Sequence, residues 1–175
     1  MRALLIPLRA PSGSLVLFRA KGLANVSTRD LAEHAGIARI YIYHYFQDWN
    51  ELRLEAFARF ADEQLQQAAQ SSAVRAFLRD CLPSNPVDAL GLWLDAWDEA
   101  LHDTKLASAY LKANQGMQGI LAAMIHRGVA SGAFRCKAPE RAARQLFALA
   151  MGYANELMLL QSAEAESAVW ESWTR

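Results

Sequence analysis

The chain has 175 residues, and its 18 basic and 18 acidic side chains give a net charge of zero. Hydrophobic residues make up 53% of the chain; Ala and Leu dominate and strand-type runs of Val, Ile and Thr are scarce, which favours an all-α fold. No apolar run approaches the roughly 20 residues that a membrane-spanning helix needs. The opening MRALLIPLRA also lacks a cleavage site, so we expect a cytoplasmic protein.

The charge is unevenly distributed along the chain. Residues 1–50 hold six Lys or Arg against three acids, a net charge of +3, while residues 51–175 hold 12 basic against 15 acidic side chains, a net charge of −3. A basic amino-terminal part on an acidic body is typical of a protein that binds nucleic acid with one end. The excess is modest, so it supports this function only together with a motif.

A first helix is expected just ahead of such a motif. Leu17 and Phe18 give it an apolar side, and Gly22 is placed to end it. Because Pro11 and Gly13 oppose a helix interior, we expect the helix either to begin near Ser12 or to be irregular at its beginning.

The stretch STRDLAEHAGIARIYIYHYF, residues 27–46, predicts two short helices joined by a tight turn. Ser27 is a good N-cap, and Asp30 is spaced to bond back to the amide of the cap residue. The first helix is therefore expected from about Thr28 to Ala35. Gly36 follows at the point where the chain must leave the helix, and a positive φ is expected there.

The second helix of the stretch is expected to begin at about Ala38. Ile42 and Phe46 are four residues apart, so they share a face and should pack into the core. The other bulky side chains then face outwards: Arg39, Tyr41, Tyr43 and His44. A short helix on a compact turn fits the major groove of DNA, where arginine reads guanine and tyrosine hydroxyls reach phosphates.

Residues 15–52 resemble the DNA-binding domain of the TetR family of bacterial transcriptional regulators. The resemblance is carried by Leu17-Phe18 and Gly22, by Ser27 to Ala32 and Gly36-Ile37, and by Ile42 to Phe46 followed by Leu52. It implies a homodimer that binds a near-palindromic operator in double-stranded DNA. By the same likeness, Thr28, Tyr43 and His44 should contact phosphates, and Arg39 and Tyr41 should read bases.

The DNA side departs from the family pattern at two places. Ala38, Ile40 and Tyr41 make the base-reading surface unusually apolar. Trp49 stands where a phosphate-holding lysine is common in the family. Because tryptophan donates one indole hydrogen bond and carries no charge, we expect a different distribution of contacts to the DNA backbone.

The pattern beyond the motif is helical throughout. Helices are expected over residues 50–70, 74–82, 87–103, 105–131 and 139–161, with a short last helix from Glu164. We therefore expect a three-helix helix-turn-helix domain over residues 1–49 and an antiparallel helical bundle over residues 50–175. By the family resemblance the bundle would bind a ligand and would dimerise through the helices at about 139–161 and 164–174.

Aromatic and methionine side chains of the second half suit a pocket for an apolar ligand. The candidates are Phe77, Trp93, Trp97, Tyr110, Met117, Met124, Phe147 and Met151. For any one of them ordinary core packing is the simpler explanation, so the pocket rests chiefly on the family resemblance.

The sequence contains no catalytic constellation, phosphate-binding loop or metal signature, so we expect no enzyme activity, no cofactor and no metal. Cys81 and Cys136 match no zinc or redox spacing. An acidic run on the helix over 87–103 is interpreted as a solvated face, with attraction of a cationic ligand as the alternative. Its members are Asp95, Asp98, Glu99 and Asp103.

The sequence thus predicts a TetR-type repressor that a small-molecule effector releases from its operator. The effector would favour a conformer in which the recognition helices are misplaced. The alternative is a helical small-molecule-binding or interaction protein whose helix-turn-helix no longer reads DNA. The two hypotheses differ in salt behaviour, because a DNA reader loses affinity for duplex steeply as salt rises.

Overall fold

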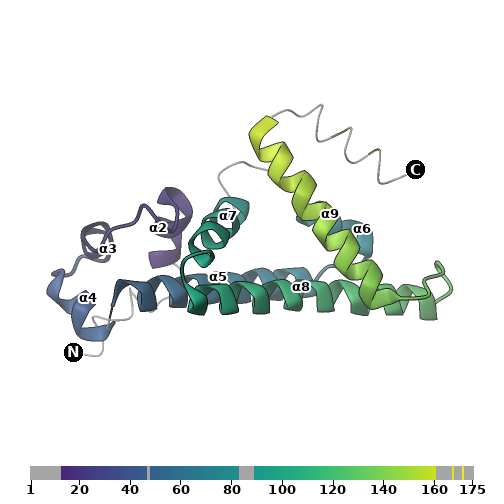
Figure 1. Cartoon of the computed structure of the whole chain (residues 1–175), viewed down its shortest axis with the longest axis horizontal. Coiled ribbons are helices and arrows are strands. Elements are labelled where there is room, and N and C mark those ends of the chain that lie inside the picture. Colours follow the sequence, from purple (N-terminus) through teal and green to yellow (C-terminus); the bar gives the residue numbers. More distant parts are fainter. Residues whose placement is uncertain (1–12, 47, 83–88, 161–166, 168–170, 172–175) are drawn as a thin grey trace. The chain divides into compact units, whose positions relative to one another are not determined.

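The computed structural model describes residues 13–46, 48–82 and 89–160 together with the single positions 167 and 171. Within these residues the chain forms eight helices, α2 to α9, and no strand (Figure 1). The predicted all-α class is confirmed. In the described residues no helix has the combination of length and apolar character that crossing a bilayer requires.

The helices lie close to where the sequence pattern predicts them. They are α2 Gly13–Lys21, α3 Thr28–Ala35, α4 Ile40–Tyr45, α5 Trp49–Ala69, α6 Val74–Asp80, α7 Ala89–Ala100, α8 Thr104–Ala130 and α9 Pro139–Leu160. The short last helix expected from Glu164 lies outside the described residues, apart from positions 167 and 171.

Three helix ends within the described residues differ from expectation by two residues or more. Helix α6 ends at Asp80 rather than Leu82. The other two differences have local reasons. The helix α4 begins at Ile40 rather than Ala38, because the turn before it is closed by a short-range bond from the Tyr41 amide to the Ala38 carbonyl (2.9 Å). The helix α7 ends at Ala100 rather than Asp103. Asp103 instead caps α8, where its Oδ1 accepts from the amides of Lys105 (2.8 Å) and Leu106 (3.1 Å).

The described chain divides into two compact units. The first unit holds α2, α3, α4, α5 as far as Gln64, α7, and α8 as far as Ala113. The second unit holds α5 from Leu65, α6, α8 from Asn114, and α9. Packing therefore groups α7 with the helix-turn-helix, whereas the predicted functional division at residue 49 separates them; that division stays a prediction.

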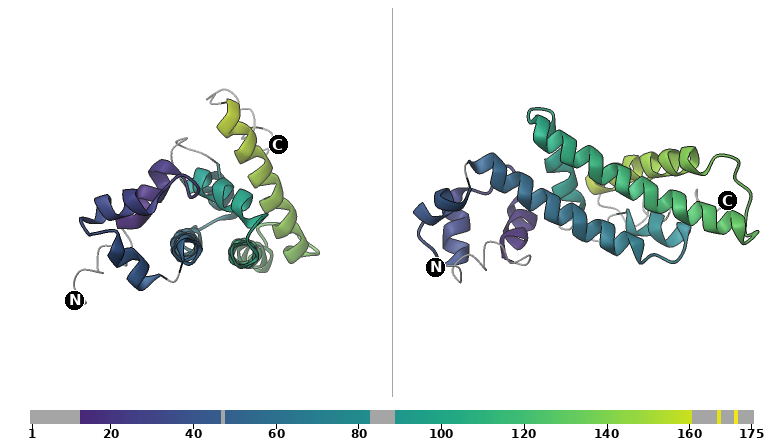
Figure 2. Two further views of the ribbon diagram at one scale, coloured as in Figure 1. Left: turned by 60° about the vertical axis from the view of Figure 1, so that its left-hand side comes forward. Right: turned by 90° about the horizontal axis from the view of Figure 1, so that it is seen from below.

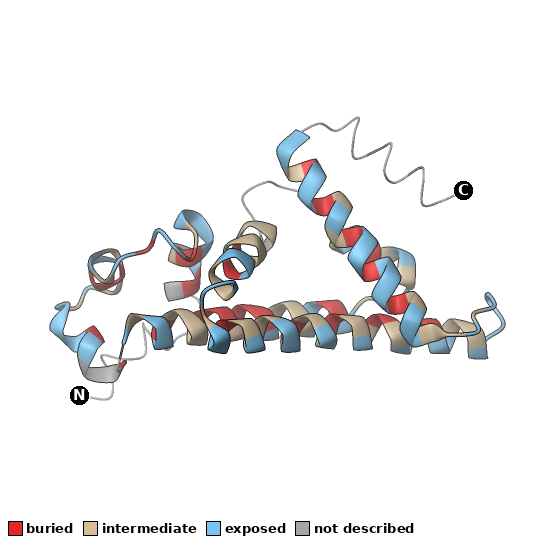
Figure 3. Cartoon of the chain, in the orientation of Figure 1, coloured by how far each residue is buried: buried red, intermediate tan, exposed pale blue. Residues whose placement is uncertain are grey.

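The core of the first unit is built around fully buried phenylalanines. Phe18 of α2 and Phe57 and Phe60 of α5 are 0% exposed, and Leu31 of α3 and Ile42 of α4 are 0% and 1% exposed. Figure 3 shows buried positions in red on the helices of this unit. Helix α2 packs on both α3 and α7. Each short helix of this unit thus buries one apolar face against the others, which stabilises helices too short to persist alone.

The second unit has a core of its own, in which α6 packs against α9 (Figures 1 and 2). Phe77 of α6, Leu121 of α8 and Phe147 of α9 are at its centre. Small residues bring helices close together here. A Cβ placed on Gly116 of α8 would lie 2.7 Å from a methyl carbon of Leu65, so this glycine permits the contact.

The turn at Gly36 generates a prediction about backbone conformation alone. Gly36 has φ +65°, and nothing lies within 4 Å of a Cβ added there. We expect Gly36→Ala to lower the free energy of unfolding by about 1 kcal/mol, because a left-handed conformation disfavours a side chain. The matched control is Gly119, which lies inside α8 and is equally free of neighbours. Gly119→Ala should raise the free energy of unfolding by about 0.5–1 kcal/mol, because alanine favours a helix over glycine. Urea unfolding measures both; changes of the same sign would contradict the conformational argument.

Candidate nucleic-acid interface

The start of α3 is fixed by a capping box that confirms the sequence prediction. Ser27 is the N-cap, and its side chain accepts from the Asp30 amide (3.2 Å). The Asp30 carboxylate in turn accepts from the Ser27 amide (2.8 Å). Two of the amides left without partners at a helix start are satisfied in this way.

Asp30 also ties α3 to α2. The Lys21 ammonium donates to Asp30 Oδ1 at 2.6 Å. This hydrogen bond, together with those from the side chain and the amide of Ser27, holds the pKa of the Asp30 carboxyl well below its usual range. Asp30 is therefore ionised at neutral pH and joins the end of α2 to the start of α3.

The turn between α3 and α4 sets the direction of α4. Gly36 is left-handed and its amide bonds to the Glu33 carbonyl (3.2 Å), while the Ile37 amide bonds to the Ala32 carbonyl (3.0 Å). This pair of bonds is the Schellman arrangement. Ile37 then packs against the core of the first unit, which anchors the chain where it enters α4.

The helix α4 buries the face that its sequence predicts. Ile42 is 1% and Phe46 is 8% exposed, whereas Tyr41 and Tyr43 are 47% and 53% exposed. Ile40 is 72% exposed, more than either of these tyrosines. The side chain of His44 lies outside the described part of the structure.

Two predicted phosphate contacts meet on this surface. Thr28 at the start of α3 and Tyr43 on α4 lie with their hydroxyl oxygens 3.4 Å apart. Each hydroxyl is able to donate to a phosphate oxygen. The two helices of the motif therefore present their hydroxyl donors at a single place, although the residues are 15 positions apart in the chain.

Arg39 differs from the other cations near the motif. Arg19 pairs with Glu63 (3.2 Å), Lys21 with Asp30 (2.6 Å) and the exposed Arg29 with Glu33 (3.8 Å). In the described part of the chain Arg39 has no carboxylate partner, and it is exposed. Its guanidinium is thus available for an outside acceptor.

Trp49 has a packing role that its position in the family pattern does not reveal. Its ring lies 6.3 Å from that of Phe18, tilted by 37°, and it packs against the core of the first unit. The residue that replaces the expected lysine therefore braces α2 against the start of α5. Sequence reasoning missed this contact, since residues 18 and 49 share no local pattern.

Asp95 of α7 holds the end of α2. Its Oδ2 accepts from the Leu23 amide at 2.8 Å, and Leu23 is 0% exposed. Gly22 beside it has φ +86°, and a Cβ there would overlap the Asp95 carboxylate. The close approach and the backbone conformation therefore both require glycine at position 22.

The predicted solvated acidic face is wrong for three of its four members. Asp95 accepts the Leu23 amide, Glu99 pairs with Arg53 of α5, and Asp103 caps α8. Arg53 and Glu99 are 14% and 26% exposed, so this pair is partly buried. Asp98 alone matches the expectation of exposure.

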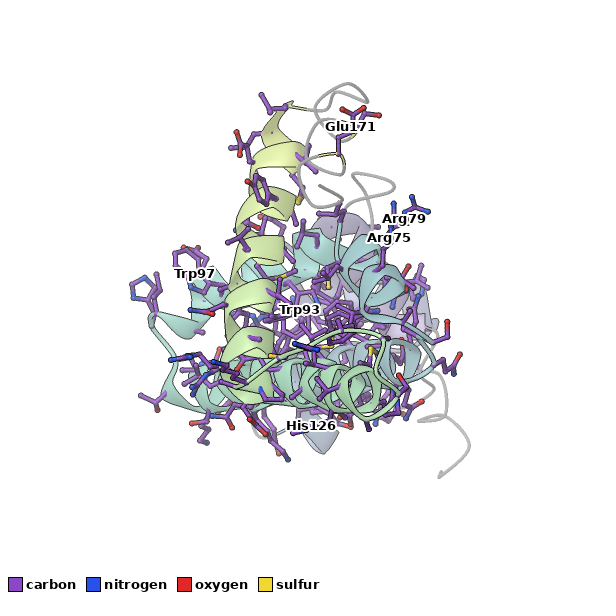
Figure 4. All side chains as sticks on the ribbon, turned by 90° about the vertical axis from the view of Figure 1, so that its right-hand side faces the viewer. Arg75, Arg79, Trp93, Trp97, His126 and Glu171 are labelled. Atoms are coloured by element: carbon purple, nitrogen blue, oxygen red, sulfur yellow. The ribbon has the colours of Figure 1, made fainter. Side chains whose placement is uncertain are left out.

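The predicted ligand residues divide between the two compact units. Trp93 and Tyr110 belong to an aromatic cluster of the first unit with Phe57 and Phe60, with ring centroids 5.4 to 6.2 Å apart. Trp97 stands outside this cluster and is 51% exposed (Figure 4). Four other candidates lie in the core of the second unit, and the fifth, Met151, is partly buried against it; the four are Phe77, Met117, Met124 and Phe147.

The sequence reading missed Phe57 and Phe60 as members of the aromatic cluster. Their signal was an i, i+3 spacing on the long helix α5, which indicates a buried face but not its partners.

The remaining His, Cys, Asp and Glu side chains of the described residues form no further site. No group of three His, Cys, Asp or Glu among them is placed to hold a metal ion. Cys81 and Cys136 are free thiols, and burial raises the pKa of Cys81 to about 12, so this thiol stays protonated. His126 Nε2 lies 2.8 Å from Glu140 Oε1, and this contact lowers the pKa of Glu140.

The short α3, the left-handed turn and the outward-facing α4 form a helix-turn-helix, the motif of a large class of DNA-binding proteins. The family profile described as "Bacterial regulatory proteins, tetR family" matches residues 12–56. A second, described as "BetI-type transcriptional repressor, C-terminal", matches residues 70–172. The chain belongs to the TetR family of transcriptional regulators.

Solved structures share the fold of this chain. A TetR-family regulator from Cytophaga hutchinsonii superposes with a TM-score of 0.78 at 20% identity, covering 98% of this chain and 90% of that one. A TetR-family regulator from Rhodococcus sp. superposes with a TM-score of 0.74 at 16% identity, covering 99% of this chain and 98% of that one. A regulator from Saccharomonospora viridis in complex with choline superposes with a TM-score of 0.70 at 23% identity, covering 90% of this chain and 86% of that one. Among curated proteins, none matches this sequence.

The Asp95 contact generates a prediction for stability. Asp95→Ala would leave the buried Leu23 amide without its acceptor, at a cost of about 1–3 kcal/mol in the free energy of unfolding. Asp95→Asn keeps an acceptor oxygen in place and should cost less than half as much. Asp98→Ala, on the exposed side of the same helix, is the control and should change little. Urea unfolding measures the free energy of unfolding of the three variants. If Asp95→Ala and Asp98→Ala lower it equally, Asp95 does not anchor the end of α2.

Proposed function

We propose that this TetR-type regulator is a repressor that binds a near-palindromic operator as a homodimer and leaves it when a small molecule binds. The observation that carries the proposal is the outward face of α4, which presents Arg39, Tyr41 and Tyr43 on a helix anchored from behind by Ile42 and Phe46. Two such helices in a dimer would enter successive major grooves. The protein would act in the cytoplasm and need no catalytic group.

The roles of the motif residues follow from their positions. Thr28 and Tyr43, whose hydroxyls lie together, would donate to a phosphate and set the register of the motif on the duplex. His44, on the same helix, would add a phosphate contact. Arg39, which has no carboxylate partner among the described residues, would read guanine, and Tyr41 would contact an adjacent base.

The effector would bind among the aromatic and methionine residues of the predicted ligand-binding bundle, residues 50–175. Trp93 is in the aromatic cluster of the first unit, and Asp95, two residues further along α7, holds the end of α2. A ligand that displaces Trp93 would therefore shift the contact that holds the helix-turn-helix. The ligand can lower operator affinity only as far as it prefers the conformer with misplaced recognition helices over the conformer that binds DNA.

Dimerisation is proposed through α9. One side of this helix is buried within the second unit at Ala143, Phe147 and Ala150. Beside this buried face, roughly 90° around the helix from its centre, Leu146 is 36%, Leu149 52% and Leu160 54% exposed. These leucines fall on one helical stripe, and an exposed apolar stripe of this kind is typical of a subunit interface.

The operator is found by selecting the purified protein against a random duplex library and retesting enriched sites across a salt series. We expect an inverted repeat whose affinity falls steeply as salt rises. Arg39→Ala should relax specificity at one position of each half-site, with a loss of about 1–3 kcal/mol of discrimination. Arg127→Ala, which removes the same charge from the end of α8, is the control and should leave specificity intact.

Two outcomes would contradict this proposal. The absence of any enriched site would favour a helical binding protein whose motif no longer reads DNA. An equal loss by Arg39→Ala on every sequence would reduce Arg39 to a phosphate contact.

The dimer is tested by placing a charge on the proposed interface. Leu149→Glu should convert the dimer to monomers at micromolar concentration, because association would bury an unpaired carboxylate. Leu111→Glu introduces the same charge at a leucine of α8 that is 59% exposed, and this control should remain dimeric. Analytical ultracentrifugation gives both masses; a dimeric Leu149→Glu would place the interface elsewhere.

A further inference from the structure

The recognition surface has an apolar residue near the middle of its outward face. At about 100° per residue, Ile40 lies about 160° around α4 from the buried Ile42. Ile40 is 72% exposed, although isoleucine is among the residues most often buried. Its neighbours on this face, Tyr41 and Tyr43, are about half exposed.

This exposure has a local cause. The Ile42 and Phe46 side chains take the face of α4 that packs into the core, and the Gly36 turn fixes which face that is. Ile40 is consequently held in solvent by the anchoring of the motif. A side chain with no hydrogen-bonding group at this place offers DNA only an apolar contact.

The major groove presents one apolar feature to such a side chain. Thymine carries a methyl group at C5, whereas the edges of the other bases present donors and acceptors. We propose that Ile40 is a specificity-determining residue that packs on a thymine methyl in each operator half-site. This inference rests on the proposed function, because it requires that α4 enters the major groove.

Deoxyuridine provides a direct test, because it differs from thymidine only in lacking the C5 methyl and keeps every hydrogen-bonding group. Each thymine of the selected operator is replaced in turn by deoxyuridine, and affinity is measured at fixed salt. We expect the wild-type protein to lose about four-fold at one thymine of a half-site, which corresponds to about 0.8 kcal/mol for one buried carbon.

Variants of Ile40 assign the effect to this side chain. Ile40→Ala should bind the thymine and deoxyuridine duplexes equally at that position, and Ile40→Val should retain most of the discrimination. Val16→Ala is the matched control, since Val16 is a β-branched residue of α2 that is 55% exposed, and it should discriminate as the wild type does. Circular dichroism checks that the variants fold.

The outcomes separate this inference from the function on which it rests. If no duplex is enriched, the proposed function and the thymine contact are both overturned. If an operator is found but no thymine is sensitive to loss of its methyl, or Ile40→Ala keeps the same sensitivity, only the thymine contact is overturned.

Discussion

The left-handed turn at Gly36 is the constraint on which the outward face of α4 depends. It ends α3 with the Ala32 and Glu33 carbonyls bonded by the amides of the turn, and it directs the chain so that Ile42 and Phe46 reach the core. Once these two side chains are buried, helical geometry dictates what α4 presents to solvent. At eight and six residues, α3 and α4 are too short to persist alone, so caps and burial hold them in place.

Three carboxylates join helices of the first unit to one another. Asp30 joins α3 to α2, Asp95 joins α7 to the end of α2, and Glu99 of α7 pairs with Arg53 of α5. Each of these carboxylates bonds to a cation or to a backbone amide, because a negative charge without a partner is costly once it is partly buried. The same helix α7 also carries Trp93 of the aromatic cluster, so packing and polar contacts in this unit meet on one element.

Sequence reasoning succeeded where the cause of a structure is local. The bounds of α3, its capping box and its glycine ending were predicted correctly because all three depend on residues within a few positions of one another. The start of α4 was predicted two residues early because a short-range turn precedes it. The acidic run was misinterpreted because its spacing is the same whether the carboxylates face water or a neighbouring helix. The contact roles of individual residues depend on the shape and charge of the DNA or ligand as well as on the fold, so they stay predictions.

The sequence by itself determined the all-α class, the two-helix motif and the inward face of its second helix. These follow from hydrophobic periodicity and from the conformational preferences of Ser27 and Gly36. The tertiary structure alone decided that Asp95 anchors the end of α2, that Trp49 packs on Phe18, and that the aromatic and methionine residues divide between two cores. The physical reason is separation along the chain: the Asp95 carboxylate and the Leu23 amide are 72 residues apart, and only folding brings them together.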